Sequence, residues 1–258
     1  MKTSHILFAI ALFMGIFATF YIELIGSIKM TTENKPIDRI SAFWLKFYDI
    51  KVTQKFSNPI RHIKVTGGKD KDLYLNIQKA PADKNSLYSI NPQNFSYKIV
   101  NDSLLIHIES RFADITLQQN VPLASIEARQ VSVCLNNIIQ DQLHIAAIDN
   151  ARFSVSKPFQ RSDQRDSIGE LTIQAANASN VYLDNLIVNT SNAVMHDAVL
   201  NYTSSTQMDS LAVHLHGRST VISNFKESRI ASIRILGNKE YFKKEFLGNG
   251  AKSIEMRP

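Results

Sequence analysis

Three histidines and three aspartates are the residues whose types and spacing could support chemistry. His214 and His216 lie two positions apart in an alternating segment, so they share one face of a strand, and His196 is expected about one repeat away. If Leu211, Val213 and Leu215 face inward, both histidines face solvent, where imidazole can bind zinc. Exposed histidines on strands are far commoner than zinc sites. We therefore predict no metal or other cofactor, and retain His214, His216 and His196 as the residues that would bind one.

Asp184, Asp197 and Asp209 recur near successive predicted corners of the chain. A glycosidase needs two carboxyl groups within about 5–10 Å of each other, and outward carboxylates could meet this condition. Aspartates solvated at turns produce the same pattern, and no other catalytic motif is present. We predict no catalytic and no cofactor-binding residues, and retain a carbohydrate-active enzyme as the alternative.

The composition of the chain excludes some classes of ligand and of functional site. The 258 residues carry a formal charge of +6, without a stripe of Lys and Arg interleaved with aromatic residues, so a nucleic-acid partner is not predicted. The single cysteine, Cys134, excludes an internal disulfide framework and most cysteine-based metal sites.

The elements that would position these residues belong to an internal repeat. LTIQAANASNVYLDN (171–185) aligns with LAVHLHGRSTVISNF (211–225), and LHIAAIDNARFSVS (143–156) aligns in the same way. Each copy contains a short alternating strand, a polar corner and a second strand. The gap between 171 and 211 accommodates two coils of about 20 residues, for which Leu186, Val188 and Val194 are the predicted inward residues. A β-sandwich is the competing fold, but the recurring register favours stacked coils. The polar insertion 157–167 is expected to be a loop.

Upstream of the repeat, alternating segments begin near residue 60 and turns recur every eight to twelve residues, which predicts an all-β chain. IKVTGG (63–68), LYLNIQ (73–78), NDSLLIHI (101–108) and the units at 171 and 211 follow an order that resembles the putative auto-transporter adhesin, head GIN domain family. The resemblance covers about residues 58–236. It implies a right-handed parallel β-solenoid, a place in a Bacteroidetes-type bacterial envelope and no enzymatic activity. The corners differ from the family's Ser-Gly-Ala-Ser, since only Gly217 keeps the glycine.

The N-terminal segment predicts a membrane anchor. No charged residue occurs in 6–22, and the apolar character continues to residue 28, so a helix of about 34 Å could span a bilayer. A cleaved signal peptide is the alternative, although the small-residue cleavage site is a poor match. Lysines after the span oppose export by the positive-inside rule. We nevertheless expect the bulk of the chain outside the cytoplasm. The predicted anchor residues include Ile6, Leu12, Phe17, Ile22 and Ile28.

The sequence thus predicts four parts: a transmembrane signal anchor (1–28), a membrane-proximal connector or cap (29–57), a β-solenoid (58–236), and a cap and tail (237–258) with a short helix over 239–246. The aromatic residues of the connector could instead form an interfacial belt on lipid. The predicted function is a non-catalytic binding, adhesion or scaffolding module of the cell envelope. Its expected partners are the bilayer and a glycan or envelope protein. A purely structural envelope protein is the second alternative.

Overall fold

The computed structural model describes residues 52–81, 84–89, 91–155, 165–203, 205–223, 229–237 and 253–257. These residues belong to one compact unit, Val52–Pro258. Within the described ranges the chain is all-β apart from one short 3₁₀ helix, η1 (Pro92–Asn94). The predicted all-β class and the predicted parallel sheets are confirmed.

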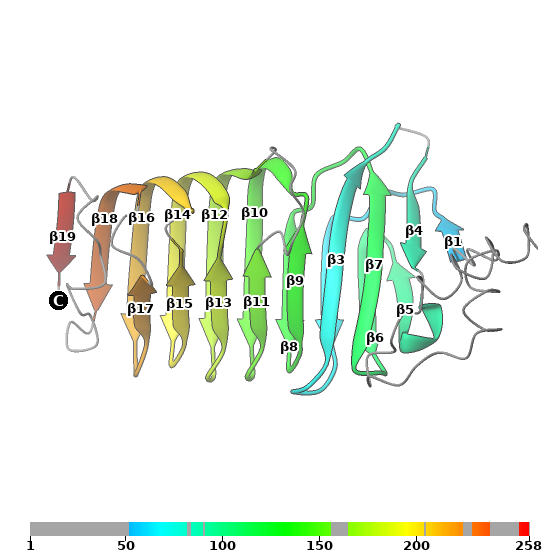
Figure 1. Cartoon of the computed structure of the whole chain (residues 1–258), viewed down its shortest axis with the longest axis horizontal. Coiled ribbons are helices and arrows are strands. Elements are labelled where there is room, and N and C mark those ends of the chain that lie inside the picture. The colour runs from blue at the N-terminus through cyan, green and yellow to red at the C-terminus, as the bar shows by residue number, and fades with distance from the viewer. Residues whose placement is uncertain are drawn as a thin grey trace, which may run out of the picture. The chain divides into compact units, whose positions relative to one another are not determined.

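The strands form two sheets (Figure 1). The first sheet has the order β1 (Val52–Lys55), β4 (Ser86–Ser89), β7 (Phe112–Gln119), β3 (Asp72–Lys79), β9 (Ser132–Asn136), β11 (Arg152–Val155), β13 (Asn180–Leu183), β15 (Val199–Tyr202) and β17 (Thr220–Ser223). The second sheet has the order β19 (Ser253–Arg257), β18 (Arg229–Gly237), β16 (Gln207–His216), β14 (Leu186–His196), β12 (Asp166–Ala176), β10 (Ile139–Ile148), β8 (Ser125–Arg129), β2 (His62–Thr66), β6 (Ser103–Ile108) and β5 (Phe95–Val100).

From β8 to β18 the strands alternate between the sheets, so each coil adds one parallel strand to each of them. Leu143 pairs with Leu171, Leu171 with Ser191, and Ser191 with Leu211. The two coils of 20 residues predicted between 171 and 211 are therefore confirmed. The inward side chains of both sheets form one continuous apolar core, which supplies the main favourable term in folding.

One predicted core residue is wrong. Leu186 and Val188 are buried as predicted, but Val194 is 43% exposed. The strand β14 bends at Asn189 and Thr190, two successive exposed residues. This bend shifts the alternation by one position, so that Ala193 and its neighbours at 191 and 195 face the core instead.

The stacking order also departs from a simple series. Both β6 and β8 pair in parallel with β2, so β2 lies between them. The chain thus places its second coil on one side of the first coil and every later coil on the other side. At the N-terminal end, β5 joins β6, β4 joins β7 and β1 joins β4 by antiparallel pairing.

The corners that lead from the second sheet to the first are polar, as the sequence predicts, and contain Asn, Asp and Gly. Asp149, Asn150, Asn177, Asp197 and Gly217 all have positive φ angles between 49° and 64°. Among non-glycine residues, Asn and Asp are enriched in this left-handed conformation.

Several predictions concern residues outside the described ranges: the anchor over 1–28, nearly all of the connector, most of the 157–167 loop and the helix over 239–246. None of the helices in the described ranges is long and apolar enough to cross a membrane. At the C-terminal end, 253–257 form strand β19, which pairs in parallel with β18 and was not predicted.

Candidate functional site

A groove of about 820 Å³ runs along the corner where the chain passes from the second sheet to the first. Its lining residues lie at or just before the starts of β7, β3, β9, β11 and β13. These five strands are adjacent in the middle of the first sheet (Figure 1). Its lining residues are almost all polar: Lys69, Asp70, Lys71, Asp72, Arg111, Ser132, Asn150, Arg152, Ala178 and Asn180.

Parallel pairing holds these residues in a row. Asp72 pairs with Ser132, Ser132 with Arg152, and Arg152 with Asn180, so each is the first residue of its strand. The backbone N–H of Asp72 donates to the Arg111 carbonyl at 2.9 Å, which places Arg111 one strand further along. Because neighbouring strands lie about 4.8 Å apart, Arg111 and Arg152 are about 14 Å apart along the row.

The groove carries four cationic side chains and two carboxylates. Lys71 Nζ donates to the Ile108 carbonyl at 2.7 Å, and the Arg152 guanidinium lies 5.8 Å from the centroid of the Tyr182 ring. Lys69 and Arg111 are exposed and form no ion pair with a described carboxylate. Guanidinium groups bind carboxylates and sulfates through two parallel hydrogen bonds, so this surface is suited to an anionic ligand.

Aromatic side chains lie next to the groove on the outer face of the first sheet. The Tyr74 and Phe112 rings are 5.0 Å apart, and Tyr182 occupies the same row three strands away from Tyr74. The smaller Cys134 and Ser154 lie between the two tyrosines. Burial raises the pKa of Tyr74, with smaller contributions from nearby Cys134 and Asp72, so Tyr74 is a neutral hydrogen-bonding group at neutral pH.

The structure brings two of the three predicted histidines together. His196 and His216 pair in register on β14 and β16, and their rings stack with centroids 6.1 Å apart. His214 pairs with Val194, one row away, and all three histidines are exposed as predicted. No group of three His, Cys, Asp or Glu side chains in the described ranges is arranged to hold a metal ion.

The three predicted aspartates occupy different places. Asp184 accepts hydrogen bonds from the hydroxyls of Thr203 (2.5 Å) and Ser205 (2.6 Å), just before β14. Asp197 follows the other end of β14, so the eleven residues of that strand separate the two carboxylates, which corresponds to roughly 36 Å of chain. Asp209 is exposed on β16. None of the three lines the groove.

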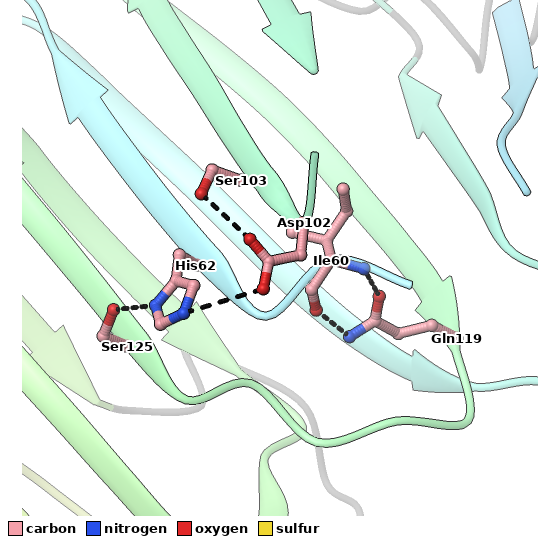
Figure 2. Close-up of polar contacts among 6 residues, drawn as sticks. All are labelled: Ile60, His62, Asp102, Ser103, Gln119 and Ser125. Atoms are coloured by element: carbon pink, nitrogen blue, oxygen red, sulfur yellow. Dashed lines mark hydrogen bonds and ion pairs between the residues drawn. The ribbon is translucent and has the colours of Figure 1, made fainter. Parts of the chain in front are cut away.

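A Ser-His-Asp contact that sequence reasoning missed lies on the outer face of the second sheet (Figure 2). His62 Nδ1 lies 2.8 Å from Ser125 Oγ, whereas His62 Nε2 lies 3.9 Å from Asp102 Oδ2, beyond hydrogen-bond distance. The His62 and Asp102 side chains are 41% and 45% exposed, so they are not held in the dry, fixed geometry of a catalytic triad. Only the pairing of β2 with both β6 and β8 brings these three residues together.

This contact lies where the first coil, which contains β2, packs between the coils that contain β6 and β8. Beside it, the buried Gln119 side chain accepts from the Ile60 N–H at 3.0 Å and donates to the Ile60 carbonyl at 2.7 Å (Figure 2). Gln119 also donates to the Val121 carbonyl at 2.7 Å. Gln119 thus joins the end of β7 to the segment entering β2. We interpret the polar residues of Figure 2 as a structural clamp.

No protein-family model and no curated protein matches this chain. The solved structures similar to it include a "putative adhesin" from Bacteroides fragilis (11% identity, covering 80% of this chain and 92% of that one, TM-score 0.42), one from Parabacteroides distasonis (13%, 80% and 97%, TM-score 0.38) and one from Parabacteroides merdae (12%, 81% and 96%, TM-score 0.39). At these identities and TM-scores, no ligand or activity of those proteins carries over to the present chain.

Proposed function

We propose that this chain is a non-catalytic binding module of the bacterial cell envelope, and that its groove holds a segment of acidic polysaccharide. The observation that carries the proposal is the row of Lys69, Lys71, Arg111 and Arg152 along one corner of the stack. Binding requires no reacting groups, and Asp184, Asp197 and Asp209 lie outside the groove.

The mixture of charges favours a polysaccharide over a uniformly anionic polymer. Asp70 and Asp72 lie among the cations and would repel a polyphosphate, but they can accept hydrogen bonds from sugar hydroxyls. Arg111 and Arg152 can bind carboxylates, and the neighbouring Tyr182 offers an apolar face and a hydroxyl. A ligand that carries carboxylates, hydroxyls and apolar ring faces matches all of these groups.

The test is titration of the full-length chain with polygalacturonate, with neutral dextran as the ligand control. Arg111→Glu combined with Arg152→Glu removes two charge-assisted contacts and should weaken binding at least about 10-fold, since each such hydrogen bond contributes roughly 1.5–3 kcal/mol. The matched control is Lys79→Glu with Lys98→Glu, which changes the charge equally at two exposed positions outside the groove.

An equal loss in both double variants would mean that net charge, not the groove, governs binding. Equal affinity for dextran, or preference for an acidic peptide or single-stranded DNA, would contradict a polysaccharide ligand. The predicted loop 157–167 overlaps strand β12, which begins at Asp166, so the deletion is limited to 157–164. Unchanged binding after this deletion would show that the loop does not contribute.

The proposal also includes the location predicted from the N-terminal segment: anchored in a membrane, with the β-domain outside the cytoplasm. Added protease should digest the β-domain in cells whose outer layers are opened while the cytoplasmic membrane stays sealed. Protection until the cytoplasmic membrane is broken would contradict this topology.

A further inference from the structure

Histidine is distributed unevenly over the two sheets. Six of the seven histidines lie in the described ranges, and all six are on the outward face of the second sheet: His62 on β2, His107 on β6, His144 on β10, His196 on β14, and His214 and His216 on β16. The pairing partners place them in three adjacent outward rows, from β6 to β16. These strands span six inter-strand steps, or about 29 Å.

Part of the permanent charge on this face is paired. Lys64 Nζ lies 3.6 Å from a Glu127 carboxylate oxygen, and Arg129 lies 3.2 Å from Asp149 and 3.9 Å from Glu127. On β18 the Arg234 guanidinium donates to the Glu255 carboxylate at 2.8 Å. Lys98 on β5, Asp141 on β10, Glu170 on β12 and Asp209 on β16 are also exposed, and none of them forms an ion pair among the described residues. Near neutral pH, carboxylates therefore outnumber cations on the outward side of the second sheet.

Acidification changes this balance, because imidazole gains a positive charge between about pH 8 and 5. Two of the histidines face a carboxylate: His62 faces Asp102 at 3.9 Å, and His196 Nδ1 lies 3.2 Å from Asp197 Oδ2. His216 stacks against His196, so these two imidazoles are both cationic when both are protonated.

The other three face uncharged neighbours. His107 Nδ1 lies 3.0 Å from the Thr66 hydroxyl, with Ser96 of β5 on its other side. His144 lies between Ser125 and Thr172, and His214 between Val194 and Leu236. Protonation of the six imidazoles therefore adds up to six positive charges to a face on which carboxylates predominate at neutral pH.

We propose that the outward face of the second sheet docks onto an anionic lipid bilayer when the pH falls below about 6, the range in which histidine carries charge. A broad sheet face complements a planar surface of negative headgroups, whereas the groove, which runs along the edge where these strands lead into the first sheet, suits a single polymer strand. The exposed Val194 and Leu105 on the same face add apolar contact. The uncharged run over 6–22, outside the described ranges, would hold the β-domain close to a bilayer.

The test uses the full chain with Cys134→Ser and Val194→Cys, labelled at position 194 with an environment-sensitive fluorophore. It is mixed with nanodiscs of phosphatidylcholine, with or without phosphatidylglycerol. The label reports on contact whether or not the N-terminal segment inserts. A blue shift is expected at pH 5.5 and not at pH 7.5, and only with phosphatidylglycerol. A label at Ser154→Cys, on the first sheet, should not shift.

The decisive variant carries His62→Gln, His107→Gln, His144→Gln, His196→Gln, His214→Gln and His216→Gln, and its thermal unfolding is measured alongside. Loss of the acid-dependent shift with unfolding unchanged supports the proposal. If that variant is poorly folded, the smaller His214→Gln with His216→Gln should reduce the shift. A shift of undiminished size in either folded variant, a shift of equal size at both pH values, or a shift produced by polygalacturonate in place of lipid would overturn it. The Arg111→Glu, Arg152→Glu variant should retain the shift, which separates this proposal from the groove.

Discussion

Ser191 is a polar residue at a core position where both neighbouring coils carry leucine. It pairs with Leu171 on one side and Leu211 on the other, and it is 1% exposed. Its hydroxyl has no hydrogen-bond partner among the described residues. The same coil carries Tyr202, the largest of the fully buried side chains. We infer that this large side chain fills core volume that the small Ser191 side chain leaves free.

Ser191→Ala should therefore stabilise the protein by about 1 kcal/mol, because it removes a buried polar group that lacks a partner. Urea unfolding monitored by circular dichroism measures the change. The matched control is Ser179→Ala, because Ser179 is also buried but its hydroxyl accepts from the Ala151 N–H at 3.1 Å. The free energy of unfolding of Ser179→Ala should be about 1–3 kcal/mol lower than that of the unchanged protein. Destabilisation of similar size in both variants would contradict the interpretation of Ser191.

Asp197, at the corner after β14, makes a pH-dependent contribution to the folding stability of the protein. The Arg218 backbone N–H donates to Asp197 Oδ1 at 2.8 Å, and this contact, with nearby His196, lowers the pKa of the carboxyl below the ordinary 3.8. A lowered pKa means that the folded state favours the ionised form. The resulting stability is present above pH 3.8 and is lost as the pH falls through the lower folded value.

Asp197→Ala should thus lower the urea midpoint at pH 7, and the difference from the unchanged protein should shrink in strong acid. Parallel unfolding curves at pH 7 and at a pH well below 3.8 make the comparison. A difference of the same size at both pH values would show that the side chain acts by packing alone.

At the scale of elements, the bends in the long strands of the second sheet determine which residues face the core. Gly169 lies at the bend of β12, and a Cβ there would be 2.6 Å from the carbonyl oxygen of Asp141 on the preceding coil. The close approach of the two backbones therefore requires glycine at this position.

Gly169→Ala should destabilise the protein by about 1–3 kcal/mol, the usual cost of overpacking, because backbone atoms must shift. The control is Gly68→Ala, where a Cβ would lie 3.6 Å from the flexible Lys71 side chain and should be nearly neutral. Differential scanning calorimetry of the two variants measures the contrast. Equal melting temperatures would mean that the bend can relax.

At the scale of the whole molecule, a stack of coils has two ends that must be closed. β19 pairs with β18 from Ser232 to Leu236 and ends the second sheet. Removing it exposes the backbone N–H and C=O groups of β18, and such an edge can pair with another chain.

Deletion of 253–258 should lower stability and promote concentration-dependent association. Light scattering after size exclusion measures the association. Glu255→Gln is the control, since it removes the ion pair with Arg234 but keeps the strand. A monomeric deletion variant of unchanged stability would show that β19 does not protect this edge.

The sequence by itself determined the local features of this protein. Alternating apolar residues set the inward faces, the spacing from 171 to 211 set two coils, and Asn and Asp marked the left-handed corners. These features depend on neighbours along the chain or on identical positions in successive coils. The misplacement of Val194 shows the limit, because a bend of one residue reverses the alternation without a distinctive residue type.

Only the tertiary structure decided the order of the first coils, the groove and the shared face of the histidines. Strands β6 and β8 have the same alternation, so local pattern cannot say that both pair with β2. Arg111 and Arg152 are 41 positions apart in the sequence but lie on one row because parallel pairing brings their coils together. Parallel stacking thus converts sequence separation into a spacing of about 4.8 Å per strand, and this conversion creates the surfaces on which function is proposed.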